Sequence, residues 1–247
     1  MLTIKKYKYK ILNRKVSGLS MSDENKEKVL NQAEEVKKET IETAKKIKES
    51  VKSVDLKEET RKTQGFVAEM FKNPINKIEE MATEDTKYFK TAIFILIVWI
   101  LAVFIKSSYS TFYYFGLERV FSNIVDVLKD VLVPAIIVTA YSLILFVFNK
   151  KEKKSLTGII STVTATQLPL VIAGLISILT IISKDFSKIS IVFNVLCLTI
   201  TVVLSFFGFK AILNEKDNGK FIKKFVLIQV IYYTIAIVLT FLGIYIY

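Results

Sequence analysis

Five long apolar stretches dominate the second half of the chain. They cover residues 91–105, 131–148, 155–183, 189–209 and 225–247. None contains Asp, Glu, Lys or Arg. A helix needs about 20 mainly apolar residues to cross the hydrocarbon core, because each residue rises only about 1.5 Å and no backbone group can stay unbonded in lipid. The pattern therefore predicts an all-α polytopic integral membrane helix bundle with five transmembrane helices over residues 91–247.

Two of these stretches depart from the ideal length. The first is short, and we expect Tyr88 and Phe89 to lengthen it at the interface. The third runs for 29 residues, from 155 to 183, which is more than a membrane needs. Pro169 lies near its middle, and because proline cannot donate a helical hydrogen bond, we expect a kink there.

Lysine and arginine in the connections predict the orientation. If the N-terminus is cytoplasmic, the inside connections 149–154 and 210–224 carry nine basic residues, and the outside connections 106–130 and 184–188 carry five. Basic residues are retained on the cytoplasmic side. We therefore expect a multi-pass protein with a cytoplasmic N-terminus and an outside C-terminus, and the Lys-, Ile- and Asn-rich composition favours a bacterial cell membrane. Within the outside connection, one-sided apolar spacing over residues 116–130 predicts a short helix lying on the outer leaflet.

Residues 1–65 form a charged arm. From Asp23 to Lys62 about half of the residues are charged, with mixed sign, and there is no Pro or Gly. Good helix formers with only a thin apolar stripe predict a helical or partly disordered cytoplasmic segment, which a partner helix or the membrane surface could stabilise. Residues 1–20 carry six basic and no acidic residues. They are either a basic tail for anionic lipid headgroups or a stretch that precedes a start at Met21.

Residues 66–90 differ from the arm in pattern. Phe66 and Met70 belong to an apolar cluster, Asn73-Pro74 then breaks the helix, and Ile78 lies on the apolar face of a second short helix. This spacing predicts an amphipathic juxtamembrane element that packs under the bundle just before the first span.

Composition excludes several kinds of chemistry. The 247 residues include no His and one Cys, so zinc fingers, disulfide frameworks and His-based acid–base catalysis are excluded. The net charge is +12, but residues 21–90 carry 15 basic and 16 acidic residues, which leaves no one-signed face for nucleic acid. Gly-rich phosphate loops, paired carboxylates and nucleophile motifs are absent from the sequence. We therefore predict no catalytic residues, no cofactor, no metal ligands and no enzymatic activity.

Polar residues at membrane depth are the candidate site positions. They are Gln167, Pro169, Asn194 and Gln229. Amides at such depth usually bond to a neighbouring helix, which is one interpretation. The other is that the break at Gln167–Pro169, together with Asn194 and Gln229, forms the solute path of a small permease or channel subunit, since broken helices build such sites in transporters.

The layout from residue 66 to residue 247 resembles the Yip1 family of five-span membrane proteins. The resemblance rests on Phe71-Lys72-Asn73-Pro74 before the first span and on the hydroxyl-rich run Ile159–Pro169 that leads to a Leu-Pro. Eukaryotic members act in vesicle trafficking and bind small GTPases, and the functions of bacterial members are mostly undefined. The resemblance implies a non-enzymatic protein that organises membrane or protein partners. We expect anionic lipid headgroups at the basic cytoplasmic loops and a protein partner at the N-terminal arm; a homo-oligomer is left open.

Overall fold

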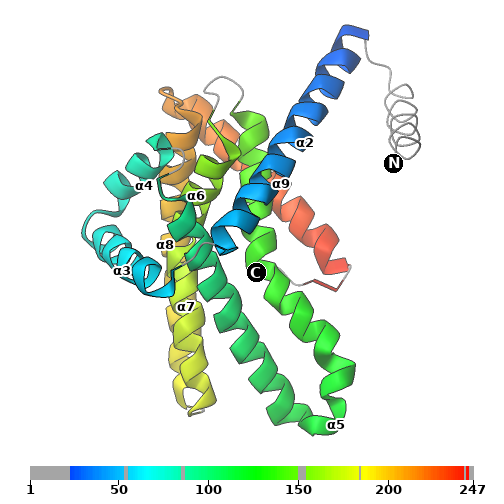
Figure 1. The fold of residues 1–247 in the computed structure, drawn as a ribbon, viewed down its shortest axis with the longest axis vertical. Coiled ribbons are helices and arrows are strands. Elements are labelled where there is room, and N and C mark those ends of the chain that lie inside the picture. The colour runs from blue at the N-terminus through cyan, green and yellow to red at the C-terminus, as the bar shows by residue number, and fades with distance from the viewer. Residues whose placement is uncertain are drawn as a thin grey trace. The chain divides into compact units, whose positions relative to one another are not determined.

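The computed structural model describes residues 23–52, 55–84, 87–149, 154–183, 185–241 and 243–244. Within these ranges every regular element is a helix (Figure 1). The basic residues 1–20 and the alternative start at Met21 lie outside the described residues. The chain divides into two compact units, residues 1–44 and residues 45–247.

The first unit contains most of α2 (Asp23–Lys52), a helix of 30 residues. The side chains described between residues 31 and 42 are mostly exposed. Thr40 uses its hydroxyl to bond the carbonyl of Val36, one turn earlier in the same helix, at 2.6 Å. The predicted helical arm is therefore present over the described residues as a mainly polar helix.

Two short helices, α3 (Leu56–Lys72) and α4 (Pro74–Thr83), precede the apolar part of the second unit. Asp55 starts α3 by accepting hydrogen bonds from the backbone N–H groups of Lys57 and Glu58. The break between the helices falls at Asn73, as predicted, because Pro74 has no N–H to continue α3 but fits the first position of α4. Helix α3 runs across residue 65, where the sequence pattern placed the end of the arm.

Helix α5 (Phe89–Phe148) has a continuous helical backbone of 60 residues. It contains two apolar legs, Phe89–Thr111 and Ile124–Phe148, and Figure 1 shows the second leg returning alongside the first. Residues 116–130 are helical, as predicted, but they belong to the 60-residue helix α5 and do not form a short helix of their own. Val125 and Leu128 are each 54% exposed and continue the apolar exterior of the second leg.

The third apolar stretch forms α6 (Leu156–Thr166), α7 (Leu168–Ile178) and the short helix η1 (Leu179–Ile181). The axes on the two sides of Gln167 differ by 49°, which confirms the predicted kink. Helices α8 (Asp185–Leu213) and α9 (Asn218–Phe241) complete the bundle. The two legs of α5, α8 and α9 are each long and apolar enough to cross a membrane, which gives four candidate spans among the described residues, and the bent pair α6–α7 makes five if it crosses as one span.

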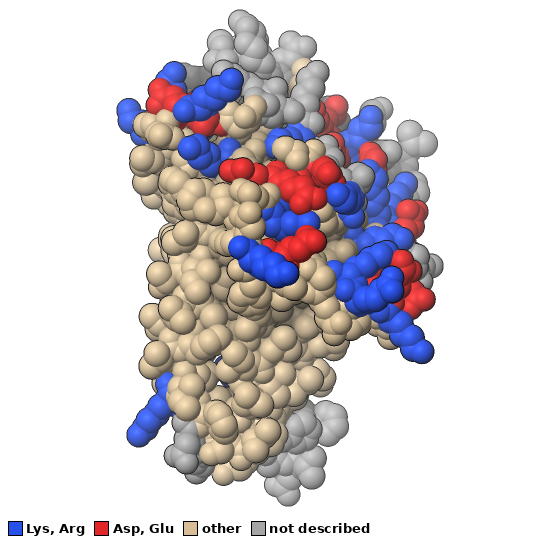
Figure 2. Space-filling view, turned by 90° about the vertical axis from the view of Figure 1, so that its left-hand side faces the viewer, with Lys and Arg blue, Asp and Glu red and all other residues tan. Residues whose placement is uncertain are grey.

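The apolar exterior and the charged end identify a multi-pass integral membrane protein. Large apolar side chains on α8 and α9 face outward, among them Val192 at 72% and Val238 at 55% exposure. Figure 2 shows a broad surface on the lower part of the visible face that carries one basic side chain, at its left edge, and otherwise no charged ones. Such an exterior is unfavourable in water and suited to lipid.

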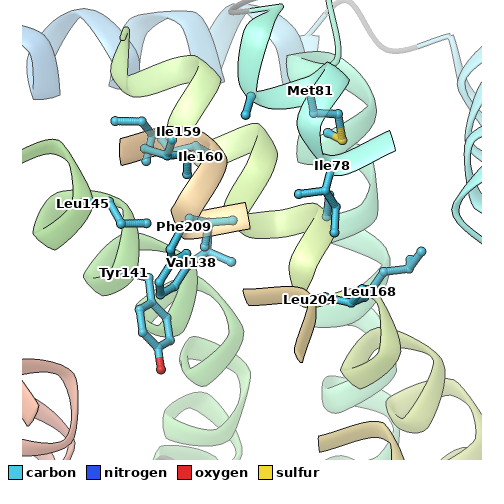
Figure 3. Close-up of a cluster of buried hydrophobic side chains, with 14 of the residues drawn as sticks. Ile78, Met81, Val138, Tyr141, Leu145, Ile159, Ile160, Leu168, Leu204 and Phe209 are labelled. Atoms are coloured by element: carbon cyan, nitrogen blue, oxygen red, sulfur yellow. The ribbon is translucent and has the colours of Figure 1, made fainter. Parts of the chain in front are cut away.

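Helix α6 is the innermost element of the bundle. All its residues are buried, and it packs against α4, α5 and α8. Ile159 and Ile160 of α6 lie in a cluster with Leu145 of α5 and Phe209 of α8, and Ile78 of α4 closes the other side (Figure 3). Helix α4 thus forms a wall of the bundle, because without it the α6 face beside Ile78 would be uncovered.

Candidate functional site

Gln167 lies at the break between α6 and α7. It is 2% exposed, and its Nε2 donates to Ser205 Oγ of α8 at 3.5 Å and to Thr166 Oγ1 at 3.3 Å. Pro169 follows in the first turn of α7 and has no N–H for the carbonyl of Ala165. The backbone carbonyl of Gln167 accepts from the N–H groups of Leu170 and Val171 and so starts α7. The polar groups at the break are therefore bonded mostly to residues of α6 and α7, and one long hydrogen bond joins Gln167 to α8.

The hydroxyls of α6 bond mostly to their own helix. Ser161, Thr162 and Thr166 donate to backbone carbonyls three or four residues earlier, at 2.9, 3.0 and 2.8 Å. Their donors are thereby satisfied without a partner helix, so buried α6 can present methyl groups to its neighbours. Among the described residues, the hydroxyl of Thr164 is buried and has no hydrogen-bond partner.

Gly208 of α8 lies close against Thr166 of α6. A Cβ placed on Gly208 would lie 2.6 Å from Thr166 Cγ2 and 3.3 Å from Ile78 Cγ2. Real carbon atoms do not pack at 2.6 Å, so only glycine fits here without a shift. Small residues are used in this way where membrane helices pack tightly.

The other two predicted positions lie apart from this break. Asn194 donates from Nδ2 to Ser190 Oγ of its own helix at 3.3 Å. It precedes Ser205 by 11 residues, or about 16 Å along α8. Gln229 of α9 accepts a hydrogen bond of 2.8 Å from Tyr141 of α5, whose ring stacks on Tyr232. No hydrogen bond joins Gln167, Asn194 and Gln229 to one another among the described residues, and Gln229 joins two helices.

Lys154 connects three elements at the charged end of the bundle. Its ammonium group donates to the carbonyl of Ala82 at 2.7 Å and to that of Ala211 at 2.8 Å. These carbonyls lie in the last turns of α4 and α8, where helix carbonyls lack internal partners and the helix dipole is negative. One cation thus holds the ends of α4 and α8 beside the start of α6.

A network of charged residues joins α3, α4 and the start of α5. Lys77 bonds Glu69 at 2.5 Å, Glu80 at 2.9 Å and the hydroxyl of Tyr88 at 2.9 Å. Glu80 also accepts from Tyr88 and from Lys87. The bond from Tyr88 and the two lysines lower the pKa of Glu80 to about 2. Burial opposes the charge of Lys77, but its bonds to Glu69, Tyr88 and Glu80 outweigh burial and raise its pKa above the usual value.

Sequence reasoning did not identify Lys154, Gly208 or the Lys77 network. Lys154 is the last residue of a lysine-rich run. It differs from the other lysines of that run only in its position next to Ser155, which caps α6. The spacing of Lys77 and Glu80 predicts a local pair on a helix, but the contribution of Tyr88 depends on how the chain folds back. What these groups do chemically is hold helices together.

No family model matches the chain, and neither curated proteins nor solved structures give a significant match. The resemblance of residues 66–247 to the Yip1 family stays a prediction from the sequence.

Proposed function

We propose that this multi-pass membrane protein is non-enzymatic and Yip1-like, and that it organises membrane or protein partners on the cytoplasmic side of the bundle. The observation that carries this proposal is the way α4 is built into the bundle. Lys154 fastens the end of α4 to the end of α8, and Ile78 is fully buried against the core. The segment that links the arm to the first span is therefore a fixed support.

The distribution of lysines supports a cytoplasmic position for this support. The end of the bundle where α5 and α6 begin and α8 ends also holds the turn into α9. Exposed Lys216, Lys220 and Lys223 lie in this turn or in the first turns of α9. Basic residues concentrate on the cytoplasmic side of membrane proteins. Helix α4 also ends here, held by Lys154, so the proposal puts the arm that precedes it in the cytoplasm and the last residues outside.

Proximity labelling in cells tests this function. A labelling enzyme is fused to the full chain, to a chain that starts at Met21 and to a chain that lacks residues 23–44. We expect the full chain and the Met21 chain to mark one common set of proteins, and the chain without residues 23–44 to lose part of that set. An unchanged set in all three would contradict a role for the arm in binding partners.

The second candidate is a small permease or channel subunit, which the buried break at Gln167 favours. In this case solute flux through proteoliposomes would fall on Gln167→Leu. Thr234→Val is the matched control, because Thr234 lies on the exposed side of α9 and its hydroxyl bonds only the carbonyl of Val230 in its own helix. Flux that is absent across a broad panel of ions and metabolites, or equal reduction by both variants, would reject this candidate.

A further inference from the structure

Helix α3 has one face that the bundle leaves uncovered. Phe66 and Met70 are buried on its inner side, whereas Leu56 is 69% and Phe71 is 71% exposed. Fifteen residues separate Leu56 from Phe71, so at 100° per residue they lie about 60° apart around the helix. Two large apolar side chains therefore project from the same side of α3, at its opposite ends.

The charges of α3 are segregated around the helix. Lys57, Arg61 and Lys72 lie within about 160° of Leu56 on the side of Phe71, and no acidic residue falls in that sector. The exposed acidic residues, Glu58 and Glu69, lie beyond it.

Ion pairing strengthens this asymmetry. Glu58 pairs with Lys62 at 2.6 Å, and Glu69 pairs with Lys77 at 2.5 Å. In the described part of the chain, no ion pair or hydrogen bond involves the charged groups of Lys57, Arg61 or Lys72. The outer sector of α3 thus carries three positive charges without an ion pair beside two exposed apolar side chains.

The position of α3 beside the first apolar leg indicates what its outer sector would meet. Phe66 of α3 packs on the ring of Tyr88, with 6.0 Å between ring centroids, and Tyr88 immediately precedes α5. Helix α3 also packs against α4 and α5. Because the first apolar leg begins at Phe89, α3 is held beside the point where the chain enters the membrane.

We propose that the outer face of α3, formed by Leu56, Lys57, Arg61, Phe71 and Lys72, binds the headgroups of anionic phospholipids in the leaflet around the bundle. Leu56 and Phe71 enter the boundary between headgroups and acyl chains, and the three basic residues contact phosphates. This inference rests on the proposed function, in which this end of the bundle meets the cytoplasmic leaflet. An acidic protein segment is the competing occupant, but the level of α3 beside Phe89 favours lipid.

A spin label at the apolar end of this face tests the proposal in the full chain. Phe71→Cys is introduced with Cys197→Ser, since Cys197 is the one native cysteine and is buried. The labelled protein is placed in nanodiscs of phosphatidylcholine, with or without phosphatidylglycerol. We expect phosphatidylglycerol to slow the rotational motion of the label and to increase the frequency of its collisions with oxygen. Each basic residue near an anionic surface contributes about 1 kcal/mol, or about fivefold, so Arg61→Gln should raise the phosphatidylglycerol needed for half of this change by about fivefold.

Controls separate this inference from the proposed function. A label at Glu79→Cys, an exposed position of α4 outside this face, should not respond to phosphatidylglycerol. The variant Lys57→Gln/Arg61→Gln/Lys72→Gln should lose the response while keeping the Trp99 emission of the folded protein. Equal spectra in both lipids, or a response that survives the triple substitution, would overturn the inference. Slowing of the label by poly-glutamate in phosphatidylcholine alone would also overturn it and assign the face to a protein. The proximity-labelling experiment with the chain that lacks residues 23–44 tests the proposed function, and its result does not depend on any of these outcomes.

Discussion

Replacing Gly208 by alanine tests the packing of α6 against α8. The added Cβ would lie 2.6 Å from Thr166 Cγ2, about 0.9 Å inside the 3.5 Å lower limit of comfortable carbon contact. Thr166 is β-branched, and its hydroxyl is bonded to the carbonyl of Val163 at 2.8 Å, so rotating the methyl away breaks that bond. Either the helices separate or Thr166 changes rotamer.

The expected loss follows from two opposing terms. Overpacking a tight core costs about 1–3 kcal/mol. Alanine is favoured over glycine inside a helix by about 0.5–1 kcal/mol, which offsets part of that cost. Gly208→Ala should therefore lower the free energy of unfolding, by up to about 2.5 kcal/mol. Gly65→Ala is the matched control, because nothing lies within 4 Å of a Cβ placed there, and it should raise stability by about 0.5–1 kcal/mol.

Unfolding in mixed micelles of mild detergent and dodecyl sulfate, followed by Trp99 emission, provides the assay. Trp99 is the one tryptophan and is buried in the core. Thr166→Ser removes the clashing methyl and keeps the hydroxyl, so it should recover much of the loss when combined with Gly208→Ala. If Gly208→Ala stabilised the protein as Gly65→Ala does, or if Thr166→Ser recovered nothing, the close contact between α6 and α8 would be refuted.

Three further changes probe the contacts that hold the bundle together. Lys154→Met should cost about 1.5–3 kcal/mol in the same assay, because two helix-end carbonyls lose a charged donor, and an unchanged midpoint would argue against the link from α4 to α8. Tyr141→Phe should cost only about 0.6 kcal/mol, since it removes the bond to Gln229 and keeps the stacked ring; a loss above about 2 kcal/mol would contradict this. The pKa of Glu80 is lowered from 4.5 to about 2, so its contribution to stability is complete above pH 4.5 and is lost as the pH falls toward 2. Glu80→Gln should therefore destabilise the protein at pH 7 more than Glu79→Gln does, and the difference should shrink in acid; equal effects at pH 7 would contradict the network.

The parts of the fold that depend on local pattern could be predicted from the sequence. Charge-free length identified the apolar stretches, and the chemistry of proline located the breaks at Pro74 and near Pro169. The bounds of the spans were less accurate, because charged residues occur in the end turns of helices, where long side chains can reach water. Asp126 and Lys129, for example, lie in the first turns of the second leg of α5.

The solute path through Gln167, Asn194 and Gln229 stays a prediction, because it was inferred from the chemical type of these residues, whereas the structure gives only their hydrogen-bond partners. Gln167 is buried at a helix break, as predicted, but Gln229 bonds Tyr141 at 2.8 Å and Asn194 bonds its own helix. Which amides meet depends on the rotation of each helix about its axis, and several faces of α8 and α9 are apolar enough to be placed inward. For the same reason, the close contact between Gly208 and Thr166 could not be predicted from the sequence.

Labelling of single cysteines in intact cells tests the central claim, that α6–α7 is one bent crossing in a five-span protein. The cysteines replace exposed residues in a Cys197→Ser background: Lys38 in the arm, Ile182 after α7, Lys216 before α9 and Phe241 at the end of α9. A membrane-impermeant maleimide added outside should label positions 182 and 241 and should reach positions 38 and 216 only after the cells are opened. If position 216 were labelled from outside while positions 182 and 241 were protected, the bent pair would return to the side from which it entered, and the five-span account would be contradicted.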